Sequence, residues 1–249
     1  MSFLEWQEPI RVGDYEVRLL KNDKELLAFQ RLRYEHLVLE FNPERNDKER
    51  LDFNDGYDEV ASQLCVFEKN GESETLVGGY VLFRCSQDVD CKTQSEFDIS
   101  KLLKKHPNKV LEISRAVVDP KHRNPIVLRL LWKGIESYVY NNNIEYLIGT
   151  VSFKGTDFSA YLKALAYVEK HYLMDEEIMA VSLQKHDLKL PELNNEELES
   201  IKKQLPPLLR GYLMNGSKMG SGVFVDEEFN SVDVFNILHK DDYGLKRLK

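Results

Sequence analysis

The alternation of apolar and polar residues divides the chain into two kinds of segment. Stretches that alternate with a period of two, or that are apolar throughout, predict β-strands, and apolar residues spaced three or four apart predict amphipathic helices. Strands are expected at residues 15–20, 64–67, 75–83, 110–118, 146–151, 178–183, 218–225 and 232–238. Helices are expected at 23–38, 97–105, 126–140 and 158–170, and one more begins near Pro206 and Pro207, where a missing amide hydrogen is tolerated.

Turn residues and polar stretches separate these elements. The Asn-Gly pair within residues 69–73 joins two apolar strands and predicts a β-hairpin. Residues 40–59 are acid-rich and have no period, so they predict a long loop of the kind that is often functional. Residues 184–204 are polar and contain Pro191, which predicts an exposed excursion from the fold.

The order of the predicted elements indicates a fold class. A strand, a helix and a long loop precede three antiparallel strands, after which helices and strands alternate. This order predicts an α/β fold with a mixed, mostly antiparallel central sheet flanked by helices. A chain of 249 residues is long enough for one large domain or two small ones, and we expect a single domain over residues 1–249.

Composition excludes several classes of protein. Hydrophobic residues make up 42% of the chain and charged residues 31%, which is ordinary for a globular protein and argues against a disordered or fibrous one. No run approaches the ~18 apolar residues of a membrane span, and acids stand near the start where a secretory signal has an apolar core. We therefore expect a cytoplasmic protein, with peripheral contact at the inner membrane face as an open alternative.

Cysteine and histidine give no sign of a cross-linked or metal-binding protein. Cys65, Cys85 and Cys91 are an odd number and contain no CxxC pair, which predicts reduced thiols rather than a disulfide framework. The six histidines include no HExxH pair, so no metal is expected.

The net charge of −8 is unevenly distributed along the chain. Residues 98–133 contain nine Lys or Arg and three acids, a local charge of +6 that leaves −14 on the remainder. An acidic protein of this kind is not expected to bind nucleic acid. The basic strip, residues 98–133, is suited to a phosphorylated cofactor, an acidic carrier protein or an anionic membrane, although a solvated helix face explains it equally well.

Four short motifs make the interpretation more specific. The first is Asp55-Gly-Tyr-Asp58, and the second combines Glu96-Phe-Asp98 with Glu112-Ile-Ser-Arg115, with thirteen residues between Asp98 and Glu112. The third is VVDPKHRNPIVLRLLW at 117–132, and the fourth begins LPPLLRGYL within 205–238. Together these motifs resemble the GNAT acyltransferase superfamily, and within it the acyl-homoserine-lactone synthases and the ornithine N-acyltransferases, an enzyme group often labelled hemolysin-like.

The resemblance implies a GNAT fold and an amide-forming enzyme. The fourth motif, and Gly155-Thr-Asp157, are typical of the ornithine N-acyltransferases alone. An enzyme of that kind moves a fatty acyl group from acyl carrier protein, or from acyl-CoA, to the amino group of a small amino acid such as ornithine, for aminolipid synthesis. A homoserine-lactone synthase acting on S-adenosylmethionine and a non-catalytic GNAT-like binding protein remain alternatives.

The second motif provides the candidate catalytic residues. On a strand, Glu112 and Ser114 face one side and Ile113 and Arg115 face the other, and a buried charge requires a partner or a ligand. The resemblance implies that Glu112 accepts a proton from the amine and that Arg115 orients this carboxylate or the thioester. The alternative is that both residues only tie the strand to its neighbours.

The substrate is expected to bind through charged groups of the first motif. Carboxylates suit an ammonium group, so Asp55 and Asp58 are candidate ligands for the amine, together with Asp157. Arg33 is the candidate partner of the substrate carboxylate. The usual Asp-His pair of the family reads Ser62-Gln63 here, and a solvated acidic loop is the alternative interpretation.

The third motif predicts how the acyl donor binds. In the pattern R-x-x-G-x-[GA], backbone amides at a helix N-terminus hold a diphosphate. This chain retains Arg123 but has neither glycine, and Pro125 has no amide hydrogen, which favours acyl carrier protein over free coenzyme A. The candidate donor-binding residues are Val117, Lys121, Arg123 and Arg129, and the donor's pantetheine arm is expected to enter a gap between the fourth and fifth strands, 110–118 and 146–151.

The fourth motif contains further polar residues of undecided role. Arg210, Tyr212, Asp226 and Asp233 are candidates to line a site or to anchor helices and turns. The anchoring role is the one we expect for Asp233.

Overall fold

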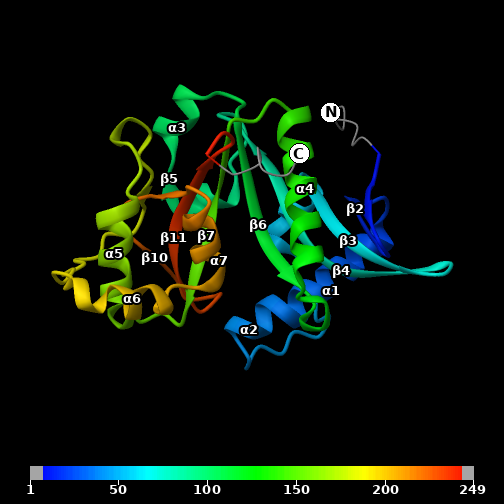
Figure 1. The fold of residues 1–249 in the computed structure, drawn as a ribbon, viewed down its shortest axis with the longest axis horizontal. Coiled ribbons are helices and arrows are strands. Elements are labelled where there is room, and N and C mark those ends of the chain that lie inside the picture. Colours follow the sequence, from blue (N-terminus) through cyan, green and yellow to red (C-terminus); the bar gives the residue numbers. More distant parts are fainter. Residues whose placement is uncertain (1–7, 243–249) are drawn as a thin grey trace. The chain divides into compact units, whose positions relative to one another are not determined.

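A computed structural model describes residues 8–242, apart from the side chains of Asp55 and Asn195 (Figure 1). The chain forms two compact units. The first unit consists of Met1–Arg84 and Ile113–Ile144, and the second of Cys85–Glu112 and Glu145–Lys249. The expectation of one domain over the whole chain stays a prediction, and each unit is described by itself.

The first unit is built on an antiparallel meander. Its strands follow one another in space in the order β1, β2, β3, β4 and β6, and β6 crosses from the second unit into the first. The β3–β4 hairpin turns between Asn70 and Ser73, which confirms the hairpin expected from the Asn-Gly pair. The strands are β1 (Ile10–Val12), β2 (Tyr15–Leu19), β3 (Ser62–Asn70), β4 (Ser73–Cys85) and β6 (Val110–Val118).

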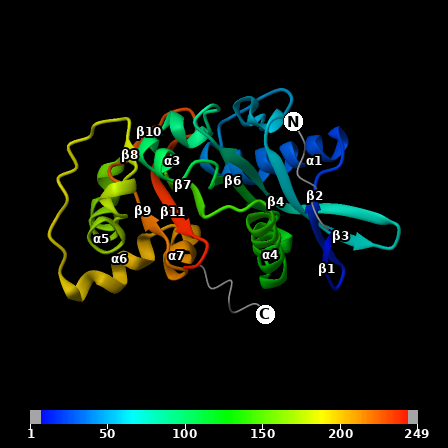
Figure 2. The same ribbon diagram turned by 90° about the horizontal axis from the view of Figure 1, so that it is seen from above.

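Two helices cover opposite faces of this meander, α1 (Asp23–Arg33) and α4 (Pro125–Asn141). Phe29 of α1 packs in a buried cluster with Cys65 of β3, whereas Gly134 of α4 lies against the neighbouring Leu64. Successive residues of a strand point to opposite faces, so α1 and α4 lie on different sides of β3, as Figure 2 shows.

The helix expected at 23–38 changes character along its length. After α1 the chain continues as a π-helical turn, Tyr34–Val38, and a last helical turn, α2 (Leu39–Phe41). Such π-turns are uncommon and often lie near functional sites. Beyond α2, the expected loop at 40–59 is irregular until the 3-10 helix η2 (Asn54–Glu59).

The second unit is centred on β7 (Tyr146–Lys154). Its first residues, Tyr146 to Ile148, pair in parallel with Val110 to Glu112 of β6, and the whole of β7 pairs antiparallel with β11 (Ser231–His239). Two short strands, β9 (Lys218–Met219) and β10 (Phe224–Asp226), also pair antiparallel with β11, and β5 (Phe97–Asp98) pairs with β8 (Val181–Ser182). The helices of this unit are α3 (Ser100–Lys105), α5 (Leu162–Tyr172), α6 (Leu198–Gln204) and α7 (Pro207–Met214).

The predicted fold class is confirmed, because the sheet is mixed, mostly antiparallel and flanked by helices. Three expected elements are wrong in detail. Residues 97–105 begin as a strand because Phe97 packs 5.9 Å from the ring of Phe235, and only the following residues are helical. The strand at 218–225 is interrupted at Gly222, where a φ of 80° takes the chain out of the extended region.

The strand expected at 178–183 is reduced to β8, because the chain forms the 3-10 helix η6 (Glu176–Ile178) just before it. The excursion at 184–204 is irregular at first and ends in the 3-10 helix η7 (Asn195–Glu197) and α6. Ile201 of α6 is buried, so the end of this segment packs into the second unit beside α5. Strand β1 was not predicted from the sequence.

A substitution in β4 tests the packing of α1 on the meander. A Cβ atom at Gly79 would lie 2.7 Å from Cys65 Sγ and 2.8 Å from both the Leu64 carbonyl oxygen and Phe29 Cε2. We expect Gly79→Ala to lower the free energy of unfolding by about 1–3 kcal/mol, measured by urea titration. The control is Gly211→Ala in α7, where nothing lies within 4 Å and the change should stabilise by about 0.5–1 kcal/mol. Parental stability for Gly79→Ala would contradict this packing.

Candidate active site

Glu112 is the last residue of β6 in the ladder with β7, and it belongs to the second unit. Its side chain is only 2% exposed. Its Oε2 atom accepts a hydrogen bond of 2.7 Å from the Thr93 backbone N–H, which attaches the 3-10 helix η3 (Lys92–Ser95) to the strand. A buried carboxylate held by one backbone donor is suited to exchange a proton with a bound amine.

The buried Cys91 thiol lies beside this carboxylate, and the buried Cys85 thiol lies beside Cys91. A hydrogen bond with Cys85 and burial raise the pKa of Cys91 above its usual range, and the nearby Glu112 carboxylate adds to the shift. The Cys91 thiol therefore stays protonated and unreactive. Cys65, Cys85 and Cys91 are all free and buried, which confirms the expectation of reduced thiols.

Arg115 begins a change of direction in β6. Its φ of 52° is left-handed, a conformation that costs an ordinary residue roughly 1–2 kcal/mol and that persists only where surrounding contacts impose it. A left-handed residue breaks the regular alternation of faces, so the expected alternation from Glu112 to Arg115 does not run through Arg115. Its Nε atom donates to Asp52 Oδ2 at 3.0 Å. Asp52 was not among the expected site residues.

Arg33, at the end of α1, is fully buried. Both of its terminal nitrogens donate to the Asp58 carboxylate, with Nη1 at 2.8 Å from Oδ1, and Nη2 also donates to the Asp52 carbonyl oxygen. Asp52 Oδ2 lies 3.1 Å from Arg33 Nε as well as close to Arg115. Arg33, Asp52, Asp58 and Arg115 thus form one ionic network, here named the Arg–Asp network, with two charges of each sign.

The Arg–Asp network bears on the expected substrate contacts. The Asp58 carboxylate accepts from Arg33 and also from Gln30 Nε2 at 3.0 Å, so a substrate ammonium would have to compete with two donors. Removing one member of a buried ion pair leaves the other charge without compensation, which is costly. The roles of Arg33 and Asp58 in substrate binding stay predictions. Asp55 falls within η2, and its side chain is outside the described part of the chain.

Asp157 has a local structural role. It is exposed and caps the 3-10 helix η5 (Phe158–Tyr161), accepting the Ser159 backbone N–H at 2.9 Å. A hydrogen bond from the Ser159 side chain, followed by the one from its backbone N–H, lowers the pKa of the Asp157 carboxyl. Substrate binding by Asp157 remains a prediction that this geometry neither uses nor requires.

The expected donor-binding residues lie in the first unit. The Val117 side chain is buried in the cluster that contains Phe29 of α1, so any contact of Val117 with a donor would come from its main chain. Lys121, Arg123 and Arg129 are exposed, and Arg123 Nη2 lies 3.5 Å from Glu40 Oε2.

The N-terminus of α4 has little capacity left for a phosphate group. Pro125 has no amide hydrogen, and the side chain of Asn124 accepts the N–H groups of Ile126 and Val127 at 3.0 and 3.1 Å. The Leu128 N–H is bonded to the Asn124 carbonyl oxygen. The first turn is capped by the chain itself, whereas a helix end that binds diphosphate leaves these donors open.

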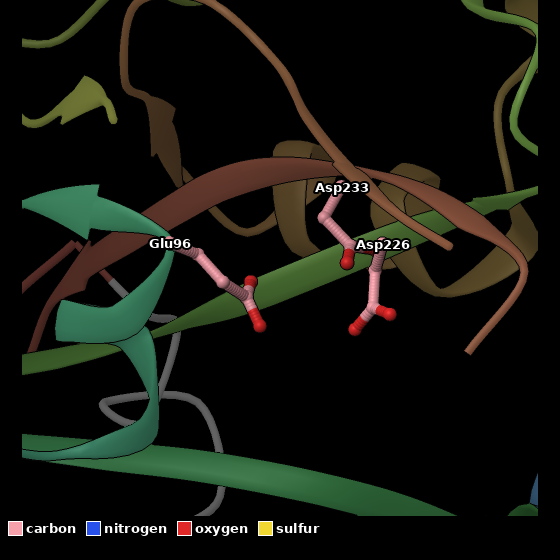
Figure 3. Close-up of side chains that lie close together, drawn as sticks. All are labelled: Glu96, Asp226 and Asp233. Atoms are coloured by element: carbon pink, nitrogen blue, oxygen red, sulfur yellow. The ribbon is translucent and has the colours of Figure 1, made fainter. Parts of the chain in front are cut away.

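The second unit also contains a cluster of three acids, Glu96, Asp226 and Asp233, here named the acidic triad. One oxygen atom from each lies within 4.8 Å of the others, and Figure 3 shows the three carboxylates directed toward one another. Glu96 and Asp233 are each 3% exposed, whereas Asp226 is half-buried. Asp233 accepts from Ser231 Oγ at 3.1 Å, and Asp226 accepts from the Phe229 backbone N–H at 2.7 Å.

Burial raises the pKa of Glu96 to about 8, and the negative charge of Asp233 is the next largest cause. Lys92 Nζ, 3.9 Å from Glu96 Oε1, opposes the shift. Glu96 is therefore mostly protonated at neutral pH. Glu96 Oε2 is buried and has no hydrogen-bond partner among residues 8–242 as described.

Sequence reasoning missed Asp52 and the acidic triad. Asp52 precedes the Asp55–Asp58 motif by three residues, and only its position between two arginines in space gives it a role. Glu96 and Asp226 stood in recognised motifs, but their separation in the sequence concealed their proximity. Asp233, for which an anchoring role was expected, is part of the same triad.

The raised pKa of Glu96 predicts a pH-dependent stability. Between about pH 4.5 and 8 the folded chain holds a proton that the unfolded chain releases, so this group lowers the free energy of unfolding as the pH rises through that window. We expect the stability of Glu96→Gln relative to the parent to increase with pH by at most about 1.4 kcal/mol per pH unit, measured by urea titration at pH 5, 6, 7 and 8. A difference that stays constant with pH would contradict the assignment.

Among the described residues, no helix has both the length and the apolar character needed to cross a membrane.

Comparison with known proteins agrees with this arrangement. Residues 32–133 match the family model described as an acetyltransferase (GNAT) domain. The chain is 33% identical to an L-ornithine N(alpha)-acyltransferase of Agrobacterium fabrum, over 92% of this chain and 82% of that protein. It is 30% identical to another of Rhodobacter capsulatus, over 90% of this chain and 89% of that one.

Among solved structures, FeeM, an N-acyl amino acid synthase from uncultured soil microbes, matches with a TM-score of 0.53 at 11% identity, over 92% of this chain and 93% of that one. That likeness shows the fold alone, whereas the ornithine enzymes match in sequence along most of their length. The chain belongs to the L-ornithine N(alpha)-acyltransferase family and is an acyltransferase of GNAT type.

Proposed function

We propose that this protein transfers a fatty acyl group from acyl carrier protein to the α-amino group of L-ornithine. The observation that carries the proposal is the buried Glu112 carboxylate at the end of the β6–β7 ladder. It lies in a chain that resembles L-ornithine N(alpha)-acyltransferases over about nine-tenths of its length. The product is an N-acyl amino acid that serves as a precursor of an aminolipid.

Glu112 acts as the proton acceptor in this proposal. The α-ammonium group gives one proton to Glu112 and becomes a nucleophilic amine, which attacks the thioester carbonyl carbon. The C–N bond forms, the C–S bond breaks, and the carrier thiolate takes the second proton from the nitrogen. The proton on Glu112 then passes to solvent. The Thr93 N–H at 2.7 Å holds the carboxylate in place during this cycle.

The Arg–Asp network positions the elements around this strand. Arg115 connects β6 to Asp52 in the 40–59 loop, and Arg33 connects the same loop to α1. The left-handed backbone of Arg115 lies three residues after Glu112 in the sequence, and the contact with Asp52 stabilises that backbone within the first unit. We assign Arg33 and Arg115 positioning roles in this reaction.

The choice of acyl carrier protein rests on the end of α4. Because Asn124 occupies the first amides of the helix, the diphosphate of coenzyme A lacks its usual set of donors there. Lys121, Arg123 and Arg129 are exposed beside two exposed apolar residues, Ile126 and Leu128. A basic surface with an apolar centre is suited to an acidic carrier domain.

The catalytic role of Glu112 is tested by Glu112→Gln. The amide retains an oxygen to accept the Thr93 N–H but cannot take up a proton, so we expect kcat to fall by about 10²–10⁴-fold with little change in KM for either substrate. Amide formation from a 3-hydroxyacyl carrier protein and L-ornithine is measured by mass spectrometry, with S-adenosylmethionine as the competing acceptor.

Glu145→Gln is the matched control for this variant. Glu145 precedes β7 and pairs with Lys109 at 3.5 Å, so its loss alters charge in the same unit without touching Glu112. It should keep parental turnover. Near-parental turnover by Glu112→Gln would show that Glu112 is not the proton acceptor. If the parent acylates S-adenosylmethionine instead of ornithine, the identification of ornithine as the acyl acceptor is wrong.

The donor assignment is tested by reversing two charges, Lys121→Glu together with Arg129→Glu. We expect KM for the acyl carrier protein to rise by about 10-fold or more at low salt, because each lost attraction weakens docking, and the effect should shrink at high salt. The control is Lys170→Glu in α5, an exposed charge of the second unit. The assignment is contradicted if the double variant and the Lys170→Glu control raise KM for acyl carrier protein equally. It is also contradicted if the parent turns over acyl-CoA faster than acyl carrier protein.

A further inference from the structure

We propose that the acidic triad of Glu96, Asp226 and Asp233 binds the side-chain ammonium group of the acceptor, and so makes the enzyme selective for a diamino acid. The inference rests on the proposed function for the identity of the acceptor. It adds a second cation-recognition site, distinct from the residues Asp55 and Asp58 that the sequence motifs indicate.

The spacing of the triad fits an ammonium group. An ammonium ion donates three hydrogen bonds in a tetrahedral arrangement, and with N–O distances near 2.8 Å its three acceptors lie about 4.6 Å apart. One oxygen from each member of the triad lies within 4.8 Å of the others. Three carboxylates from three different segments therefore supply one acceptor for each N–H.

The hydrogen bonding of the triad is incomplete by itself. Glu96 is 3% exposed and its carboxylate is directed toward Asp226 and Asp233 (Figure 3). Within the described part of the chain, no hydrogen-bond partner reaches its Oε2 atom. A buried acceptor without a donor is costly, so a donor that enters the triad is stabilised there.

The negative charge of the triad also favours the binding of a cation. The pKa of Glu96 is raised by burial and by Asp233, with a smaller contribution from Asp226, because a charged Glu96 would lose hydration and be repelled by the neighbouring carboxylates. Lys92 offsets part of this charge from 3.9 Å. An ammonium ion relieves the repulsion more effectively than a proton on Glu96, since it contacts all three acids.

The triad is accessible and is near the proposed proton acceptor. Asp226 is half-buried, so an amine can enter from its side, while Glu96 and Asp233 form the buried floor. The charge of Glu112 contributes to the raised pKa of Glu96, which places the two carboxylates within electrostatic reach in the same unit. The two amino groups of ornithine are separated by five bonds, about 6 Å when extended, and the inference requires this length to connect Glu112 with the triad.

The test compares L-ornithine with L-norvaline, which has the same carbon skeleton without the side-chain amine. With acyl carrier protein as donor, we expect the parent to prefer ornithine in kcat/KM. Asp233→Asn and Glu96→Gln should each reduce this preference by about 10- to 100-fold, mainly through KM for ornithine, because each loses a charge-assisted contact. Glu227→Gln, an exposed acid next to Asp226, is the matched control and should keep the parental preference.

Two outcomes would overturn the inference. The first is a loss that is equal for ornithine and norvaline, which is the result of a purely structural triad. The second concerns divalent metal ions. If Mg²⁺, Ca²⁺ or Mn²⁺ raises the melting temperature of the chelator-treated parent but not that of Asp233→Asn, the triad binds a metal ion instead.

A binding experiment separates this inference from the proposed function. Without any donor, ornithine should raise the melting temperature of the parent and not that of Asp233→Asn, and norvaline should have no effect on either protein. If the parent binds ornithine in this way but never acylates it, the proposed function fails and the triad assignment stands. If the parent acylates ornithine and Asp233→Asn retains its ornithine preference, the proposed function stands and the triad assignment fails.

Discussion

The first unit depends on the neutralisation of two buried arginines. Arg33 has no exposed surface, and its charge is tolerable only because Asp58 and Asp52 surround it with acceptors. Asp52 shares its carboxylate with Arg115, so the same two acids also determine where β6 changes direction. An irregular loop of the length of 40–59 would cost much conformational entropy to order, and these contacts offset that cost.

The fold was largely predictable because most of its elements follow from turn residues and hydrophobic patterns within short segments of the sequence. The hairpin at β3 and β4 follows from an Asn-Gly turn between apolar runs, and α4 begins at the Asn124-Pro125 pair that a helix start requires. The failures have tertiary causes. Phe97 belongs to a helical pattern in sequence, but its contact with Phe235, far along the chain, makes it part of a strand.

The site was predictable only in part, for the same reason. Glu112 stands in a recognisable motif on a strong strand, so its position on that strand was expected. Asp52 has no local signature, and its role arises from two arginines that reach it from α1 and β6. Glu96 is separated from Asp226 and Asp233 by more than half the chain in sequence, although the three acids are close in space. A local hydrophobic pattern does not indicate a contact between such distant residues.

The left-handed residue in β6 determines how this protein can change over evolution. The left-handed Arg115 changes the face of the sheet on which the following side chains lie. Val117 therefore reaches the hydrophobic cluster only if the number of residues in this part of the strand is unchanged. Side chains there can be exchanged for others of similar size. The loss or gain of a single residue after Arg115 would exchange inner and outer faces and take the Val117 side chain out of the hydrophobic cluster. Within this stretch the length of the chain is more strongly constrained than its composition.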